Sequence, residues 1–161
     1  MLMATLLPVI GKPAPDFTLP STSGEDVSLR QFKGKKTVVL YFYPNDDTPG
    51  CTKEACQFRD LYWDFDKVGA VIYGVSADDM DSHKKFQYKH QLGFDLLSDP
   101  TAAVCKAYGV WKQKNLYGKK FMGIERTTFV IDKTGRVAQI YPKVKVEGHV
   151  AEVLAFLRDE D

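Results

Sequence analysis

The sequence predicts an α/β fold. Residues 36–43 are almost continuously apolar, which is typical of a strand that lies inside a sheet and is covered on both faces. A helical pattern follows from about residue 50 to 66, and residues 70–76 form a second apolar run. This order of strand, helix and strand indicates the α/β class. With 161 residues and 44% hydrophobic content, the chain is long enough for one buried core and short for two, so we expect a single domain over 1–161.

The helix expected at 50–66 is supported by apolar side chains that recur at helical spacing. Such residues share one face of a helix and can pack against a sheet. They are Cys51, Ala55, Phe58, Tyr62 and Phe65.

Outside this unit, turn residues separate shorter periodic segments. In chain order, we expect a hairpin within 17–29, a helix at 81–91, a helix from 100 to about 108, paired strands at 127–132 and 137–141, and a closing helix at 148–158. Asp99 and Pro100 are suited to be the N-cap and the first residue of the helix that follows them.

Residues 111–122 combine Trp, Tyr, Phe and Met with four lysines. We interpret this segment as an ordered loop with aromatic anchors. The alternative is that it forms a wall of the functional site.

Charge and composition exclude several classes of partner. The 22 basic and 21 acidic residues are well mixed and leave a net charge of +1, so we expect neither nucleic acid nor an anionic membrane as a partner. The apolar first ten residues lack a basic start, contain Pro8 and are too short for a secretory core or a span, so we expect a docked or loose terminus. Three cysteines without disulfide-scaffold spacing suit a reducing compartment, which predicts the cytoplasm.

The most informative stretch runs from Pro44 to Cys51, directly after the apolar strand. A Pro-rich turn here delivers Cys51 into the first turn of a helix. Unpaired backbone N–H groups and the positive end of the helix dipole stabilise a thiolate, which is the reactive form of cysteine. This placement predicts a redox nucleophile.

The same stretch resembles the peroxiredoxin family. Pro44, Thr48 and Cys51 fit its P-x-x-x-T-x-x-C pattern, and Cys56 lies where one branch of the Q-type peroxiredoxins carries a resolving cysteine. Residues 107–111 and 123–132 resemble the sequence of that subfamily around its active-site arginine, which corresponds to Arg126. The Q-type proteins are also called bacterioferritin comigratory proteins, and the resemblance extends from about Gly11 to Leu157.

The resemblance implies a thioredoxin-like fold of the peroxiredoxin type, with an N-terminal β-hairpin extension. It also implies a thiol peroxidase that reduces hydrogen peroxide and organic hydroperoxides. Cys51 would become a sulfenic acid and then form a disulfide with Cys56, which thioredoxin or a related dithiol protein would reduce. No metal, haem or flavin is implied, and the subfamily resemblance implies a monomer.

The resemblance further implies roles for the neighbouring residues. Arg126 would hold both the thiolate and a peroxide oxygen, because a guanidinium stays charged and offers several donors. The Thr48 hydroxyl would align the bound peroxide. Pro44 would shield the thiolate from water, and Gly50 would let the backbone approach the substrate.

Several residues keep an alternative interpretation. Arg126 could instead form a surface ion pair with Glu125, and the Thr48 hydroxyl could cap the helix. Glu54 could orient Arg126 or only complement the helix dipole. We interpret Cys105 as a packing residue.

The histidines show no metal-ligand spacing, and we expect them to be solvated or structural. They are His83, His90 and His149.

Other functions are alternatives to the peroxidase interpretation. In a dithiol exchanger or thiol-based redox sensor, two residues usually separate the cysteines, whereas four separate Cys51 from Cys56. A noncatalytic, chaperone-like module on the same fold would tolerate loss of Cys51. A cysteine hydrolase is disfavoured because no His lies in a recognisable catalytic motif.

Overall fold

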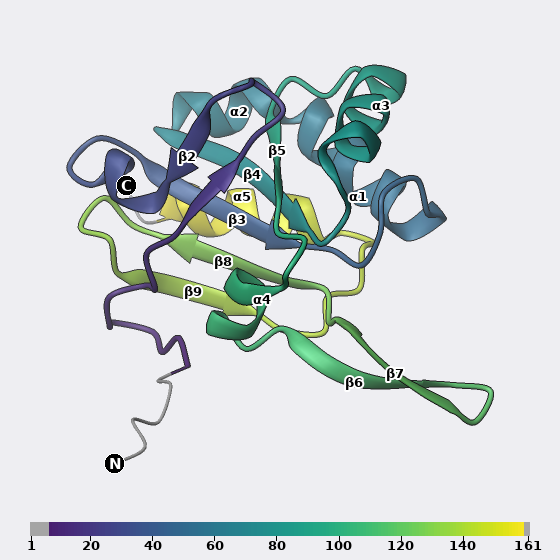
Figure 1. The fold of residues 1–161 in the computed structure, drawn as a ribbon. Coiled ribbons are helices and arrows are strands. Elements are labelled where there is room, and N and C mark those ends of the chain that lie inside the picture. Colours follow the sequence, from purple (N-terminus) through teal and green to yellow (C-terminus); the bar gives the residue numbers. More distant parts are fainter. Residues whose placement is uncertain (1–6, 160–161) are drawn as a thin grey trace, which may run out of the picture.

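The computed structural model describes residues 7–159, so the first six residues of the expected N-terminal segment and residues 160–161 lie outside it. A central five-stranded sheet organises the fold (Figure 1). Its strands, in spatial order, are β5 (Asp95–Ser98), β4 (Ala70–Ser76), β3 (Thr37–Phe42), β8 (Thr127–Ile131) and β9 (Val137–Tyr141). β3, β4 and β5 are parallel, whereas β8 runs antiparallel to both β3 and β9. The predicted α/β class and thioredoxin-like architecture are confirmed.

Alternate residues of β3 contribute to two cores, one on each face of the sheet. Val39 and Tyr41 belong to the core beneath α1 (Pro49–Asp60), α2 (Tyr62–Lys67), α3 (Met80–His90) and α5 (His149–Asp159). Leu40 and Phe42 belong to the opposite core, which contains β1 (Thr18–Pro20), β2 (Asp26–Ser28), the 3₁₀ helix η1 (Leu29–Phe32) and α4 (Ala103–Ala107). The expected N-terminal hairpin therefore covers one face of the sheet.

The helix expected at 50–66 is divided in two. Leu61 has φ −103° and ψ 12°, outside the helical range, and ends α1 before α2 begins. Phe58 and Phe65 are fully buried in the same core on either side of this break. Apolar spacing could not reveal the break because both helices bury residues against one surface.

The region around residue 99 also differs from the prediction. Residues 95–98 form β5, a strand too short to show a clear period. The next helix covers only 103–107, so Pro100 is not its first residue and Ala102 is its N-cap. The Asp99 carboxylate nevertheless accepts hydrogen bonds from the backbone N–H of Val104 and Cys105, at 3.3 and 2.8 Å. Asp99 thus satisfies N–H groups of the helix from outside the cap position.

The prediction of a loop at 111–122 was wrong. These residues form a hairpin of β6 (Trp111–Leu116) and β7 (Lys119–Ile124) that projects from the body of the protein (Figure 1). Tyr117 and Gly118 connect the strands, both with positive φ, as a two-residue hairpin turn of type I′ requires. A Tyr-Gly pair is a weak sequence signal for this turn because Asn or Asp usually occupies its first position.

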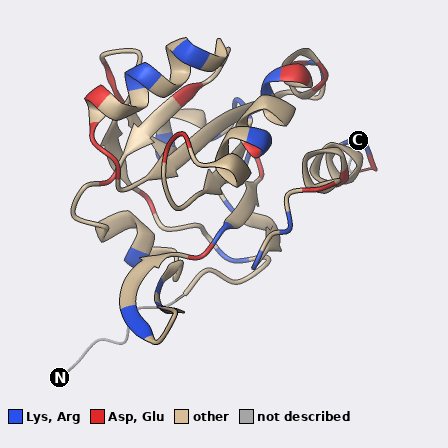
Figure 2. Cartoon of the chain, turned by 90° about the vertical axis from the view of Figure 1, so that its right-hand side faces the viewer, with Lys and Arg blue, Asp and Glu red and all other residues tan. Residues whose placement is uncertain are grey.

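Charged residues are interspersed along the chain rather than gathered by sign (Figure 2). Among the described residues, no helix is long and apolar enough to cross a membrane.

Candidate active site

The site forms where β3 ends and α1 begins. Thr48 occupies the N-cap position with an extended backbone, and its carbonyl oxygen accepts a hydrogen bond from the N–H of Thr52 at 2.8 Å. Pro49 is the first helical residue, a position at which no backbone donor is needed. Cys51 therefore lies in the first turn of α1, where N–H groups have no partner within the helix. Only 1% of its surface is exposed.

Arg126 reaches this thiol from the neighbouring strand. The antiparallel register pairs Phe42, the last residue of β3, with Thr127, the first residue of β8. The register therefore places Arg126 beside the start of α1. Its Nη2 donates to Cys51 Sγ at 3.3 Å, and its Nη1 donates to Glu54 Oε1 at 2.7 Å.

Glu54 is the buried partner of the Arg126 guanidinium. Its side chain has no exposed surface, and its second oxygen, Oε2, has no hydrogen-bond partner. Burial raises the pKa of Glu54 to about 7, although Arg126 opposes the shift. Burial lowers the pKa of Arg126, but Glu54 and Cys51 outweigh it, so the pKa lies above its ordinary value. The site thus keeps a cation beside the thiol.

The structure decides two of the alternatives for contacts in this region. Arg126 forms its ion pair with Glu54 and not with Glu125. The Oε2 atom of Glu125 instead lies 3.5 Å from Lys112 Nζ. The Thr48 hydroxyl donates to the carbonyl oxygen of Asn45 at 3.0 Å and makes no capping bond to α1. This hydroxyl therefore bonds within the loop that precedes Cys51 and not to the helix.

Gly50 has a steric reason to lack a side chain. A Cβ atom at this position would lie 3.1 Å from Arg126 Nη2. The missing side chain leaves room for the guanidinium, which sequence reasoning did not foresee. Pro44 is half-buried at the start of the loop.

The three cysteines are free and occupy different environments. Cys56 is half-buried on α1, five positions after Cys51. Cys105 belongs to the core on the other face of the sheet. Burial, followed by a hydrogen bond to Asp99, raises the pKa of the Cys105 thiol far above its usual range. These surroundings are those of a packing residue.

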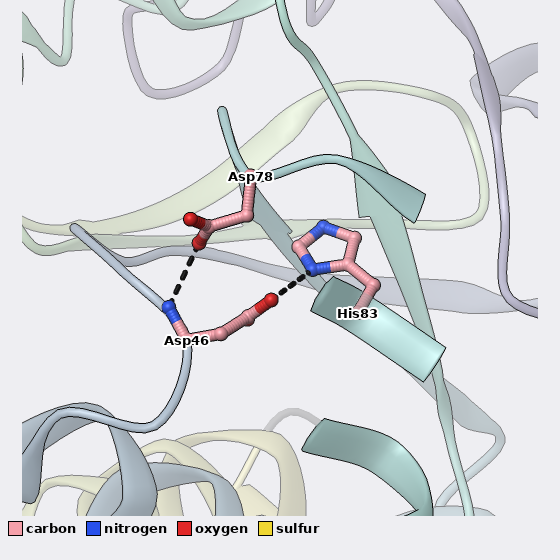
Figure 3. Close-up of side chains that lie close together, drawn as sticks. All are labelled: Asp46, Asp78 and His83. Carbon is pink, nitrogen blue, oxygen red and sulfur yellow. Dashed lines mark hydrogen bonds and ion pairs between the residues drawn. The ribbon is translucent and has the colours of Figure 1, made fainter. Parts of the chain in front are cut away.

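Among the described residues, one cluster has side chains placed to bind a cation: Asp46, Asp78 and His83, whose candidate ligand atoms lie within 4.8 Å of one another (Figure 3). Asp78 Oδ2 already accepts from the N–H of Asp46 at 2.8 Å and from Ser76 Oγ at 2.7 Å. His83 Nδ1 lies 2.7 Å from Asp46 Oδ2. Hydrogen bonds within the protein therefore account for the cluster without an ion.

The other two histidines lie apart from this cluster. His149 is buried on α5, with Nε2 2.8 Å from Thr128 Oγ1. Burial and, to a lesser extent, Arg126 lower the pKa of His149 to about 4, so the ring is neutral at physiological pH. His90 Nε2 lies 3.5 Å from Asp47 Oδ1. The structure makes His83 and His149 structural rather than solvated.

Comparison with known proteins connects this geometry to a family. The model of the AhpC/TSA family matches residues 10–140. The chain belongs to this family. It is 55% identical over 148 residues to a putative peroxiredoxin bcp of Coxiella burnetii, covering 92% of this chain and 97% of that one. It is 53% identical over 150 residues to peroxiredoxin Bcp of Bacillus subtilis, covering 93% and 95%.

A solved structure agrees with this peroxiredoxin assignment. It is a trapped intermediate/ligand complex that informs on the alkyl peroxide reduction activity of the bacterioferritin comigratory protein of Xanthomonas campestris. Its sequence is 45% identical, it aligns with a TM-score of 0.85, and the match covers 89% of this chain and 91% of that one. This chain is accordingly a peroxiredoxin of the Bcp/Q type, a thiol peroxidase.

Proposed function

We propose that this peroxiredoxin reduces hydrogen peroxide and organic hydroperoxides with Cys51 as the attacking thiol. The observation that carries the proposal is the 3.3 Å contact between Arg126 Nη2 and Cys51 Sγ in the first turn of α1. The guanidinium and the free N–H groups of that turn both favour negative charge. Organic hydroperoxides are included because alkyl peroxide reduction is reported for the similar Xanthomonas campestris protein.

In the first step, the Cys51 thiolate attacks one peroxide oxygen and the O–O bond breaks. The departing oxygen takes a proton and leaves as water or an alcohol, while Cys51 becomes a sulfenic acid. Arg126 stabilises the negative charge that develops on the peroxide oxygens. The Thr48 hydroxyl donates to the bound peroxide and so aligns it with the thiolate. Pro44 limits the access of water to the thiolate.

In the second step, the Cys56 thiolate attacks Sγ of the Cys51 sulfenic acid. A disulfide forms and one water is released. Cys56 is the resolving residue because it shares α1 with Cys51, whereas Cys105 lies across the sheet in a core that disfavours its thiolate. Since the two cysteines cannot meet on an intact helix, resolution includes opening of the first turns of α1.

The third step needs an external reductant. A small dithiol protein, thioredoxin or a relative, gives two electrons to the Cys51–Cys56 disulfide and becomes a disulfide itself. We propose that the chain performs this cycle as a single-domain monomer in the cytoplasm, where free thiols are maintained.

The test is anaerobic stopped-flow mixing of the reduced protein with hydrogen peroxide or an organic hydroperoxide. Thiol loss should be rapid in the wild type and abolished in Cys51→Ser. Cys56→Ser should keep the first step and accumulate sulfenic acid. A dithiol exchanger or a noncatalytic module would instead consume no peroxide, and equal rates in wild type and Cys51→Ser would refute the proposal.

A further inference from the structure

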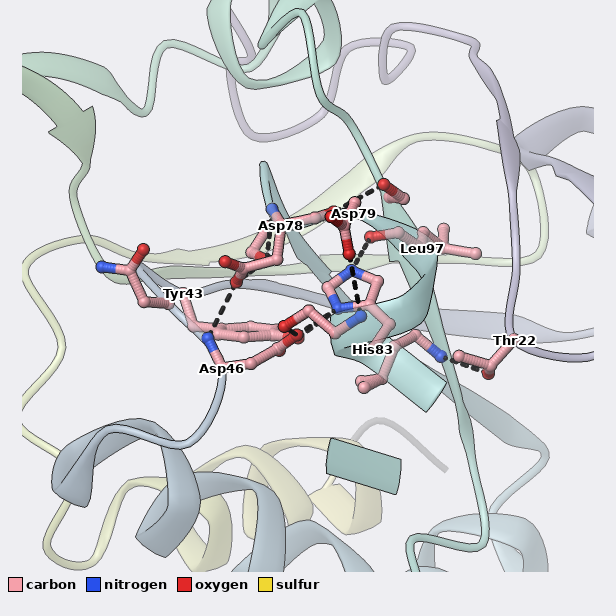
Figure 4. Close-up of polar contacts among 12 residues, drawn as sticks. Thr22, Tyr43, Asp46, Asp78, Asp79, His83 and Leu97 are labelled. Atoms are coloured by element: carbon pink, nitrogen blue, oxygen red, sulfur yellow. Dashed lines mark hydrogen bonds and ion pairs between the residues drawn. The ribbon is translucent and has the colours of Figure 1, made fainter. Parts of the chain in front are cut away.

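A buried polar network connects the loop before Cys51 to α3 (Figure 4). Asp46 Oδ1 accepts from Tyr43 Oη at 2.6 Å, and Asp46 Oδ2 accepts from Ser82 Oγ at 2.8 Å. His83 Nδ1 lies 2.7 Å from the same Oδ2. The side chains of His83 and Asp46 are 0% and 3% exposed. Nothing in the proposed reaction uses His83, although it lies against the loop that carries Thr48.

Both ring nitrogens of His83 have hydrogen-bond partners. Its Nε2 lies 2.8 Å from the carbonyl oxygen of Leu97, which can only accept, so Nε2 carries a hydrogen. Its Nδ1 faces the Asp46 carboxylate, whose two oxygens already accept from two hydroxyl groups. The Asp46 carboxyl group therefore has three side-chain partners, two of which lie on α3. His83 thus links the Asp46 side chain to the backbone of β5 at Leu97.

This pair is better suited to fixing a geometry than to adding stability. A buried polar pair gains little over well-packed apolar residues because both groups lose their hydration, but breaking it leaves a buried polar group without a partner. Asp46 thus has one favourable position, which α3 and the carbonyl of Leu97 define. Asp46 lies two residues before Thr48 and five before Cys51.

The backbone of the loop is held to the same region. The N–H of Asp46 donates to Asp78 Oδ2 at 2.8 Å. The next residue, Asp47, adopts a positive φ of 60° and bonds through both carboxylate oxygens to Lys89 Nζ at 3.0 Å. Asp tolerates this conformation better than most residues do, and the bond to Lys89 ties it to α3. The loop is therefore bonded both to α3 and to Asp78, which precedes that helix.

We propose that His83 is a positioning residue, which acts through Asp46 to set the loop that presents Thr48 and the start of α1 to the peroxide. This inference rests on the proposed function. A displacement of about 1 Å in such a loop costs about 100-fold in rate when reacting atoms must be aligned. A thiol reagent that needs no alignment by Thr48 is much less sensitive to the same displacement.

The test compares His83→Gln, Asp46→Asn and the double variant with Lys84→Gln, an exposed control on the same helix. We expect the rate constant of Cys51 with peroxide to fall about 10- to 100-fold in each single variant, with less than about threefold change toward a neutral alkylating agent. The double variant should be no slower than the worse single variant, because both changes break one pair. Additive losses, or peroxide rates within about twofold of the Lys84→Gln control, would overturn the proposal.

A second measurement does not depend on peroxide. Nitrogen-15 NMR of the wild type should show Nε2 of His83 protonated, as its contact with the carbonyl of Leu97 requires, and an unprotonated Nε2 would overturn the proposal. If His83→Gln does not fold, Ser82→Ala removes one donor to Asp46 and should lower the peroxide rate about threefold, whereas an unchanged rate would count against the inference. A wild type inert to peroxide would refute the proposed function, whereas a reactive wild type with unchanged rates in His83→Gln and Asp46→Asn would overturn the inference alone.

Discussion

Arg126 and Cys51 lie 75 residues apart in the chain, yet the guanidinium donates to the thiol sulfur at 3.3 Å. The antiparallel pairing of β3 with β8 produces this contact, because it aligns Phe42 with Thr127. Glu54, on the same helix as Cys51, accepts from the other end of the guanidinium. Arg126 therefore has two partners that hold its planar fork in one orientation.

Replacing Arg126 tests the electrostatic part of this arrangement. Arg126→Met should lower the rate of peroxide attack about 100- to 1000-fold, because a donor to the developing charge is lost. Arg126→Lys should recover only part of the rate because an ammonium lacks the planar fork. Stopped-flow kinetics provide the measurement, and an Arg126→Met rate within about threefold of the wild type would contradict the argument.

Thr48 should act on the peroxide rather than on the thiol. Thr48→Val keeps the shape and removes the hydroxyl, so the peroxide rate should fall about 10-fold or more while neutral alkylation changes little. Thr48→Ser should retain much of the wild-type rate. Equal losses toward both reagents would instead assign Thr48 to support of the loop, through its bond to the carbonyl of Asn45.

Gly50→Ala tests the space around the guanidinium. The new Cβ would lie 3.1 Å from Arg126 Nη2 and would push it from Cys51. We expect a loss of about 10-fold in peroxide rate with little loss of stability, because α1 tolerates alanine. Urea unfolding serves as the control. An unchanged peroxide rate would show that Arg126 accommodates the methyl group without leaving the sulfur.

Glu54 and His149 should act on stability in opposite directions as pH changes. The folded-state pKa of Glu54 is raised from 4.5 to about 7, so its contribution is present below pH 4.5 and is lost as pH rises through 7. The folded-state pKa of His149 is lowered from 6.5 to about 4, so its contribution is present above pH 6.5 and is lost as pH falls toward 4.

Urea unfolding between pH 4 and 7 can separate the two groups. In Glu54→Gln, the free energy of unfolding should rise with pH more steeply than in the wild type, by about 1–3 kcal/mol over this range. In His149→Gln, the difference from the wild type should have the opposite sign. Parallel curves for all three proteins would contradict both assignments.

Formation of a Cys51–Cys56 disulfide should require local unfolding of α1. On an intact helix, positions five apart have Cα atoms about 8.6 Å apart and point roughly 140° from each other. A disulfide spans at most about 7 Å. Phe58, fully buried and stacked on Tyr41, can anchor the later turns while residues 50–57 unwind.

Hydrogen exchange on reduced and oxidised protein measures this opening. Protection over residues 50–57 should fall on oxidation and remain in the turn around Phe58. Unchanged protection together with a mass-mapped Cys51–Cys56 bond would exclude the mechanism. A bond mapped to Cys105 would identify a different resolving residue.

The success of the sequence predictions depended on how local each signal was. The buried strand β3, the helix that starts beside Cys51 and the closing helix were identifiable because periodicity and capping act over a few residues. The β6–β7 hairpin was missed because its Tyr-Gly turn is not a typical turn pair, and β5 because four residues show no clear period. The break at Leu61 was hidden because the residues on both sides bury against the same core.

By itself, the sequence determined the α/β class and the placement of Cys51 at the amino end of a helix, since both follow from patterns within short segments. Only the tertiary structure decided which groups surround that thiol. The register of β3 and β8 brought Arg126 to Cys51, and the packing of α3 against the loop brought His83 to Asp46. Contacts of this kind depend on how distant segments pack, and the residue types within each segment do not encode that arrangement locally.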